Sequence, residues 1–248
     1  MVQQLLYKWL LKMEEVGTMT SFKSFTKKET LLDELTSNIV QVLKESIDKN
    51  AKASLLVSGG STPKPLFEKL SNIDIAWDKV VISLVDDRWL DPSHKDSNEL
   101  LVKKNLMQNF ASKASFVGMY IDGKSAYDSD ELCSKTYQEK VYPFDVVILG
   151  MGGDSHTASL FPKNEKLKEA YDLENKNLCI SIKPDTAPYD RMSLTLGAIL
   201  SAKNIILHIE GEEKLKVYEE ALKSDDIFKT PISAVLNNEN VEVEVYHA

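Results

Sequence analysis

Apolar and polar positions alternate along the chain with two different periods. Short apolar runs, typical of buried strands, are found at residues 53–57, 80–85, 144–149, 178–182, 205–209 and 241–246. Between these runs the sequence predicts helices at residues 30–48, from residue 63 onward, and at 96–108, 130–141 and 211–222. Thr62 has the place of a helix N-cap, and Asp96 with Glu99 has the spacing of a capping box. Strands that alternate with helices predict an α/β fold with a mostly parallel, doubly wound (Rossmann-like) sheet and helices on both faces.

The sequence predicts one catalytic domain preceded by a short extension. The apolar run at residues 1–13 is too short to cross a bilayer, and the residues after it lack the cleavage pattern of a secretory signal. No repeat, low-complexity tract or linker interrupts the rest of the chain. We therefore expect residues 1–25 to be an N-terminal extension and residues 26–248 to be a single α/β domain.

The composition narrows the classes of partner. The 248 residues include 30 Lys or Arg and 38 Asp or Glu, which gives a net charge of −8. Such a surface repels nucleic acid and anionic lipid, so we expect no nucleic-acid and no membrane partner, although a few cations in one cleft could still bind a small anion. Cys133 and Cys179 form no CxxC pair, and the four histidines form no HxH or HxxxH pair. We expect two reduced thiols in the cytoplasm, no metal site and a monomeric chain.

Two segments that follow predicted strands could bind an anion. In the first, Ser58-Gly59-Gly60-Ser61-Thr62-Pro63, the glycines would allow a phosphate to approach the backbone, next to the free N–H groups of a helix N-terminus. The alternative is a plain strand–turn–helix junction with Thr62 as a structural cap. The second is Asp86-Asp87-Arg88, where Arg88 could bind a phosphate or carboxylate and a carboxylate could orient it. The alternative there is a local surface salt bridge.

The segment Gly150-Met151-Gly152-Gly153-Asp154-Ser155-His156 presents a histidine in a glycine-rich loop after a predicted strand. We expect a short helix to begin at His156 and to favour a neutral imidazole, which can accept a proton from water. The alternative is a structural histidine. The segment does not favour dinucleotide binding, because the third glycine of GxGxxG is missing and no acidic residue ends a following strand at the right distance.

A fourth segment adds two cations beside prolines. Lys183 precedes Pro184, and Arg191 follows the Ala187-Pro188-Tyr189-Asp190 turn. The segment is either part of an anion site or a solvated loop before a helix.

These segments together resemble the 6-phosphogluconolactonase family, within the group that also contains glucosamine-6-phosphate deaminases. The resemblance runs from about residue 30 to the C-terminus. The segment GMGGDSHTASLFP at residues 150–162 is the specific part, because the lactonase pattern reads GMG-x-DGHTASLFP whereas the deaminases carry FNEP after the histidine. SGGSTP, VDDRWL and KP…RMSLT are similar to further lactonase segments.

The resemblance implies a role for each matching residue. His156 matches the catalytic base, and Asp86 matches the first acid of the family's DER segment, which supports the site. The implied phosphate or substrate ligands are Gly59, Gly60, Ser61, Thr62, Arg88, Lys183 and Arg191. Three departures stand out: Asp87 replaces the usual Glu, Asp185-Thr186 interrupts the KPP run, and Ser155 replaces a glycine. If that position needs a positive φ, Ser155 is strained.

The implied reaction is hydrolysis of 6-phospho-D-glucono-1,5-lactone to 6-phospho-D-gluconate, without a metal or organic cofactor. His156 would take a proton from the attacking water, and N–H groups of residues 150–153 would stabilise the oxyanion. Two other functions remain open from the sequence: a glucosamine-6-phosphate deaminase or isomerase, and a non-catalytic sugar-phosphate sensor.

Overall fold

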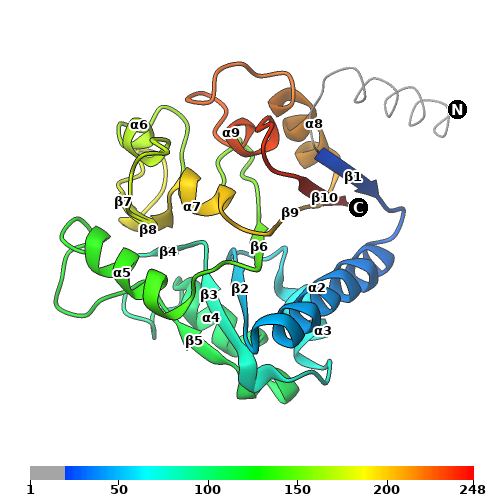
Figure 1. The fold of residues 1–248 in the computed structure, drawn as a ribbon. Coiled ribbons are helices and arrows are strands. Elements are labelled where there is room, and N and C mark those ends of the chain that lie inside the picture. Colours follow the sequence, from blue (N-terminus) through cyan, green and yellow to red (C-terminus); the bar gives the residue numbers. More distant parts are fainter. Residues whose placement is uncertain (1–19) are drawn as a thin grey trace, which may run out of the picture.

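Seven parallel strands form the central sheet of the protein (Figure 1). The computed structural model describes residues 20–248. The strands run in the order β1-β10-β9-β6-β2-β3-β5. Their bounds are β1 Thr20–Ser24, β2 Ala53–Val57, β3 Val80–Leu84, β5 Ser115–Val117, β6 Val146–Leu149, β9 Asn204–Ile209 and β10 Val243–His247. Five of these strands were predicted from their apolar runs, and the parallel α/β class is confirmed.

A second, antiparallel sheet contains the segments around Arg88 and Arg191. It consists of β4 (Asp86–Arg88), β8 (Arg191–Leu194) and β7 (Cys179–Ile182), with β8 in the middle. One expectation was therefore wrong, because β7 does not belong to the parallel sheet. Asp86-Asp87-Arg88, predicted to lie at the end of the strand at residues 80–85, forms a separate strand of the small sheet. Val85 joins the two sheets, because its N–H donates to Val57 O (3.1 Å) and its carbonyl accepts from Leu194 N (2.8 Å).

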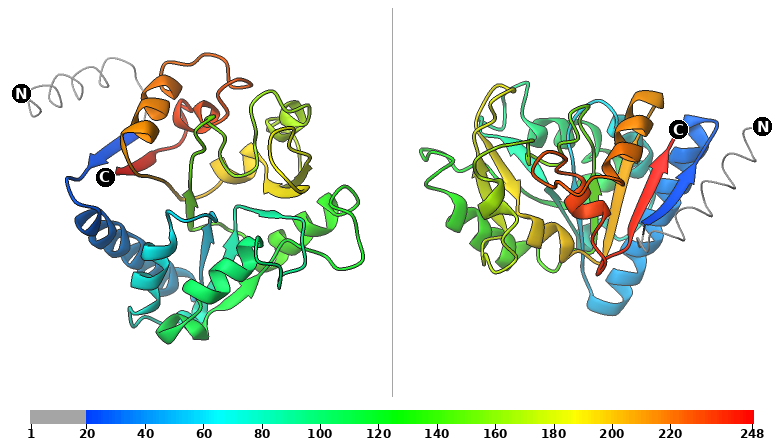
Figure 2. Two further views of the ribbon diagram at one scale, coloured as in Figure 1. Left: turned by 180° about the vertical axis from the view of Figure 1, so that it is seen from behind. Right: turned by 90° about the horizontal axis from the view of Figure 1, so that it is seen from above.

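Helices lie on both sides of the parallel sheet (Figure 2). They are α2 (Lys28–Asn50), α3 (Lys64–Ser71), α4 (Asn98–Asn105), α5 (Asp130–Lys140), α6 (Leu167–Ala170), α7 (Leu196–Leu200), α8 (Glu212–Ala221) and α9 (Ser233–Leu236), with two short 3-10 helices at Trp77–Lys79 and Asn109–Lys113. The longest, α2, buries Leu31, Leu35, Ile39 and Leu43 at helical spacing against β2, β6 and β10. It ends where Ala51 turns left-handed (φ 62°). None of the helices between residues 20 and 248 is both long and apolar enough to cross a membrane.

Two helices begin differently from the sequence prediction. Helix α3 begins at Lys64 with Pro63 before it in a helical conformation, and no side chain of that position caps it. Thr62 is therefore not an N-cap and its hydroxyl is not used there. Helix α4 is capped by Ser97, whose Oγ accepts from Leu100 N at 3.3 Å, and not by Asp96.

Part of the predicted extension belongs to the sheet. Strand β1 pairs along its whole length with β10, and Phe25 N donates to His247 O at 2.8 Å. The boundary placed at residue 25 therefore lies before Thr20, and the remainder of the predicted extension lies outside the described residues.

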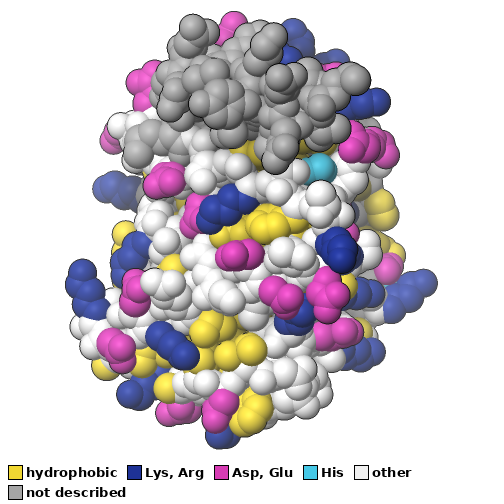
Figure 3. Space-filling view, turned by 90° about the vertical axis from the view of Figure 1, so that its right-hand side faces the viewer, with side chains coloured by type: hydrophobic (Ala, Val, Ile, Leu, Met, Phe, Trp, Pro, Cys, Tyr) yellow, Lys and Arg dark blue, Asp and Glu magenta, His cyan; other side chains and the backbone are white. Residues whose placement is uncertain are grey.

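The face seen in Figure 3 mixes acidic and basic side chains without a broad patch of one sign.

The order of the strands places a crevice between β2 and β6. The chain proceeds outward from β2 through β3 to β5, then returns to β6 and proceeds the other way through β9 to β10. Ligands of open α/β sheets bind at such a reversal, outside the carboxyl ends of the strands. The carboxyl ends of β2 and β6 are held together at this crevice, because Ser58 N and Ser58 Oγ both donate to Ile148 O, each at 3.0 Å.

Candidate active site

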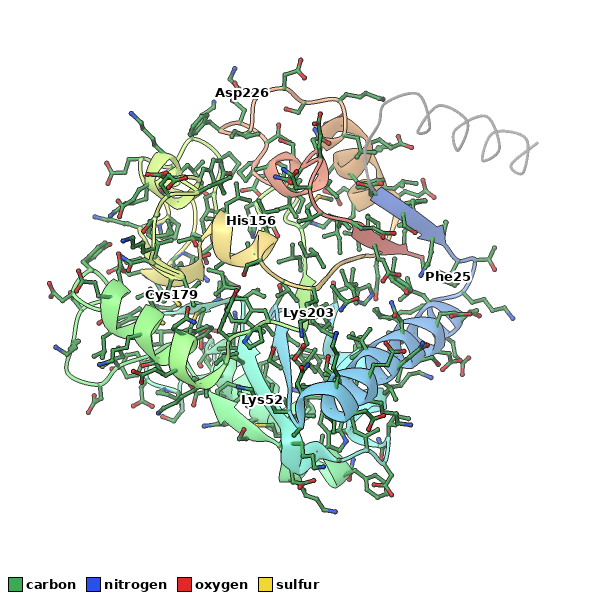
Figure 4. The ribbon with its side chains drawn as sticks, in the orientation of Figure 1. Phe25, Lys52, His156, Cys179, Lys203 and Asp226 are labelled. Atoms are coloured by element: carbon green, nitrogen blue, oxygen red, sulfur yellow. The ribbon has the colours of Figure 1, made fainter. Side chains whose placement is uncertain are left out.

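A cleft of about 700 Å³ opens at the carboxyl ends of β2, β6 and β9 and is closed on one side by the small sheet. Figure 4 shows His156 on this side of the sheet, far from Lys52 and Lys203, which precede β2 and β9 at their amino ends. The residues that line this cleft include Gly59, Gly60, Ser61, Thr62, Asp86, Arg88, Asn98, Gly152, His156, Tyr189, Arg191, His208, Glu210 and Lys214. The cleft thus gathers all but one of the predicted site residues.

His156 is oriented by Asp154. Its Nδ1 lies 2.6 Å from Asp154 Oδ1, and its backbone N–H donates to the same oxygen at 3.2 Å. An ionised carboxylate can only accept, so Nδ1 carries a hydrogen and Nε2 of a neutral ring is left as a proton acceptor. The hydrogen bond from His156 lowers the pKa of Asp154 below its usual value, which keeps this carboxylate ionised. Asp154 was not among the predicted site residues. Its position two residues before His156 is the feature of the sequence that points to it.

The loop that carries His156 is a tight turn rather than the start of a helix. Gly152 N donates to His156 O (2.8 Å), Ser155 N donates to Gly152 O (3.1 Å), and the next helix begins only at Leu167. The expected helix at His156 was therefore wrong, and the orientation of the ring comes from Asp154 instead. The ring also lies against Phe161, with 4.6 Å between the centroids.

Two positions of this turn favour glycine, one because of the space available and the other because of its φ angle. A Cβ atom on Gly152 would lie 2.1 Å from His156 Nδ1, so only glycine leaves room for the imidazole. Ser155 has φ 69°, in the left-handed region, so the strain expected for a non-glycine residue there is confirmed. Ser155 is nevertheless held from both sides, because its carbonyl also accepts from Ile232 N at 3.1 Å.

The turn after β2, residues 58–63, also lines the cleft. Gly60 adopts φ 99°, which a residue with a side chain rarely takes. A Cβ atom on Gly59 would lie 1.9 Å from Asn98 Oδ1, so glycine is needed for the turn to pack against α4. The hydroxyls of Ser61 and Thr62 make no hydrogen bond with other described residues and remain available to a ligand.

Two arginines lie side by side on the wall made by the small sheet. Arg88 and Arg191 are direct cross-strand partners, and both line the cleft. Arg88 Nη1 donates to Asp96 O at 2.5 Å, and Arg191 Nη2 donates to Pro188 O at 3.0 Å. Within residues 20–248 neither guanidinium has a carboxylate within 4.0 Å, and the buried Nε of Arg191 has no hydrogen-bond partner. Like charges opposite each other repel, so this wall favours an anion.

The two acids before Arg88 have different surroundings. Asp86 is buried at the edge of the cleft, and Ser159 Oγ donates to its Oδ2 at 2.5 Å. Burial lowers the pKa of Arg191, and the nearby negative charge of Asp86 opposes this shift, so Asp86 helps to keep the guanidinium charged. Asp87 instead accepts from the backbone N–H groups of Asn98 (2.7 Å) and Glu99 (3.1 Å) at the start of α4. Burial raises the pKa of Asp87 to about 6.

Lys183 is the predicted ligand that the structure does not bring into the cleft. It follows β7 with an exposed side chain, and its carbonyl accepts from Asn164 Nδ2 at 2.7 Å. The cleft lining instead contains three charged or titratable residues that were not predicted from the sequence: His208, Glu210 and Lys214. They come from the end of β9 and the first turn of α8, where no glycine-rich or paired motif marks them. Among residues 20–248, no group of three or more His, Cys, Asp or Glu side chains could hold a metal ion.

Comparison with known proteins gives a consistent result. The family model described as glucosamine-6-phosphate isomerases/6-phosphogluconolactonase matches residues 26–244. A 6-phosphogluconolactonase of Mesorhizobium japonicum is 37% identical over 94% of this chain and 97% of its own length. One from Helicobacter pylori is 39% identical over 82% of this chain and 87% of its own. The crystal structure of a 6-phosphogluconolactonase from Shewanella baltica superposes with a TM-score of 0.88 at 43% identity, over 92% of this chain and 97% of that one.

Proposed function

Because the chain belongs to the glucosamine-6-phosphate isomerase/6-phosphogluconolactonase family, we propose that it hydrolyses 6-phospho-D-glucono-1,5-lactone to 6-phospho-D-gluconate with His156 as general base. The chain is an enzyme that hydrolyses a lactone ester in the pentose phosphate pathway. The observation that supports the proposed mechanism is the Asp154–His156 pair, at 2.6 Å, in the cleft between the anion-binding wall and β9.

In this mechanism the phosphate is held at one end of the cleft. Arg88 and Arg191 lie on the wall, and the turn from Gly59 to Thr62 offers backbone N–H groups and free hydroxyls below them. Asp86 acts indirectly, because its negative charge helps to keep Arg191 charged. Lys183 does not line the cleft. Its role as a further phosphate ligand therefore remains a prediction from the sequence.

The reaction itself takes place at His156. Its Nε2 accepts a proton from water as the water oxygen attacks C1 of the lactone. The bond from C1 to the ring oxygen then breaks, and the imidazolium gives its proton to that oxygen. Asp154 holds the ring in the tautomer that this sequence requires. A lactone is an activated ester, so one well-oriented base is sufficient for the chemistry.

We further propose a cytoplasmic enzyme that acts as a monomer without a nucleic-acid or membrane partner. Cys133 and Cys179 are free and buried, as suits a reducing compartment.

The test is the rate of 6-phosphogluconate formation from freshly prepared lactone, coupled to 6-phosphogluconate dehydrogenase. We expect the wild type to exceed spontaneous hydrolysis and His156→Ala to lose about 10²- to 10⁴-fold in kcat. His94→Ala is the matched control, because His94 is a partly exposed histidine outside the cleft lining. Full activity of His156→Ala would exclude the base. Ammonia release from glucosamine 6-phosphate, or ligand binding without turnover, would instead favour a deaminase or a sensor.

A further inference from the structure

A tyrosine beside the two arginines has a backbone conformation that aromatic residues rarely adopt. Tyr189 has φ 69°, in the left-handed region, and its exposed side chain lines the cleft. The residues on either side are anchored, because Pro188 O accepts from Arg191 Nη2 (3.0 Å) and Asp190 O accepts from Trp89 N (2.7 Å). Strained residues persist where their surroundings hold them, and they gather at ligand-binding sites. The strain at Tyr189 therefore directs attention to what its side chain contacts.

The side chain of Tyr189 contacts the segment that leads into α4. Its hydroxyl donates to Asp96 Oδ2 at 3.1 Å, and its ring meets the ring of His94 edge to face, with 5.8 Å between the centroids. The backbone N–H of Asp96 donates to His94 Nδ1 at 3.2 Å. Asp96 is thus held by its carboxylate on one side and by its backbone on the other.

Asp96 also contacts Arg88, but through its backbone. Arg88 Nη1 donates to Asp96 O at 2.5 Å, and among residues 20–248 no carboxylate oxygen lies within 4.0 Å of the Arg88 guanidinium. The hydrogen bond to Asp96 raises the pKa of the Tyr189 hydroxyl, and the positive charge of Arg88 opposes this shift, so the three groups are within electrostatic reach of one another. A carboxylate released in this position would compete with a bound anion for the guanidinium.

We propose that Tyr189 is a positioning residue that holds the Asp96 carboxylate away from Arg88 and so leaves the guanidinium available to an anion. The inference rests on the proposed function in one respect, because the anion there is the phosphate of the substrate. It does not depend on where the lactone carbonyl lies, since it concerns only Arg88 and its neighbours. Without the tyrosine hydroxyl, the Asp96 side chain can rotate onto the guanidinium that its own carbonyl already contacts.

The expected effect is a change of a few-fold, because the competing pair is partly exposed. Arg88 and Asp96 are both only partly buried, and ion pairs in such surroundings are weak and screened by salt. Loss of the hydroxyl should therefore weaken anion binding about three- to fivefold at low ionic strength. The Asp154–His156 pair is not altered, so kcat should stay within about twofold of the wild type.

The experiment measures the dissociation constant of inorganic phosphate by titration calorimetry at low ionic strength, and KM and kcat in the coupled lactone assay. Tyr189→Phe removes only the hydroxyl and should raise the dissociation constant and KM by similar factors. Tyr127→Phe is the matched control. The hydroxyl of Tyr127 also donates to a carboxylate of this segment, Asp190 Oδ1 at 2.8 Å, but neither of these two residues lines the cleft. This variant should keep the wild-type values.

A double-mutant cycle separates the proposed role from a structural one. In the Asp96→Asn background no carboxylate is left to compete, so Tyr189→Phe should change phosphate binding by less than about twofold. Unchanged binding in Tyr189→Phe alone would overturn the assignment, and so would an equal loss in both backgrounds, because the hydroxyl would then act without Asp96. Phosphate binding that Arg88→Met leaves unchanged would overturn it as well.

Phosphate binding requires no turnover, which separates this inference from the proposed function. A wild type that binds phosphate and shows the expected cycle, but does not accelerate lactone hydrolysis, would refute the proposed function and leave the role of Tyr189 in place.

Discussion

Replacing Ser155 by glycine should relieve strain in the turn that presents His156. Ser155 has φ 69° and is buried, and both of its backbone polar groups are hydrogen-bonded, so the conformation is imposed by its surroundings. In an L-residue the left-handed conformation places Cβ too close to the next carbonyl oxygen, which costs roughly 1–2 kcal/mol. Glycine has no such cost.

The expected gain is smaller than this strain. Glycine gives the unfolded chain more freedom, which offsets about 0.4–1 kcal/mol. The comparison that isolates Cβ is therefore between Ser155→Gly and Ser155→Ala. We expect the glycine variant to be more stable by about 0.5–1 kcal/mol, or about 1–4 °C in Tm for a chain of this size. The turn keeps its hydrogen bonds, so kcat should change by less than about twofold.

Urea unfolding at neutral pH, followed by circular dichroism, measures this difference. Ser201 supplies the control, because it is a serine with φ −76° at the end of α7. There the order should reverse, with Ser201→Gly less stable than Ser201→Ala. If Ser155→Gly is also the less stable of its pair, the strain argument is refuted, and the left-handed conformation carries no measurable cost at this position.

Three further changes test other parts of the site. Gly152→Ala places a methyl group in the space of the imidazole and should lower kcat at least about 100-fold, measured in the coupled assay. Asp154→Asn removes the carboxylate that fixes the tautomer of His156 and should also lower kcat about 100-fold or more, with KM little changed. Burial raises the pKa of Asp87 from 3.8 to about 6, so the folded protein binds its proton more tightly than the unfolded chain. The resulting stability is present below pH 3.8 and lost as the pH rises through about 6. Urea unfolding at several pH values should show this fall in wild type, and a pH-independent difference from Asp87→Asn would contradict it.

The central strands could be predicted because burial on both faces leaves a direct mark in the sequence. Every residue of β2 and β6 is buried; β6 reads as an uninterrupted apolar run, and β2 does so except for Ser54. The short strands β4 and β8 leave no such mark, because they contain charged residues and pair across more than a hundred positions of sequence. Only the fold reveals that Asp86–Arg88 and Arg191–Leu194 are neighbours.

The candidate site was predictable to the extent that its chemistry lies at strand ends. Gly59 and Gly60 lie just after β2, and His156 lies in the loop after β6, which is where open sheets bind ligands. Lys214 could not be found in this way, since a lysine in the sequence Glu-Glu-Lys-Leu-Lys has the pattern of a solvated helix face. Its place in the cleft lining depends on which face of α8 is turned toward the cleft, and only the packed fold shows this.

In the proposed mechanism, the arrangement of Arg88 and Arg191 links phosphate binding to the small sheet. Arg88 and Arg191 face each other across β4 and β8, and the backbone N–H of Trp89 donates to Asp190 O (2.7 Å) just beyond this pair. Cross-strand like charges oppose pairing of the strands, but at Arg191 the attraction of Asp86 is stronger than the repulsion of Arg88. In the proposed mechanism a phosphate between the two guanidiniums would add a hydrogen-bonded bridge between the two strands. The phosphate site of the proposed mechanism thus extends across two strands of the small sheet, whereas the Asp154–His156 pair lies in the loop after β6 of the parallel sheet.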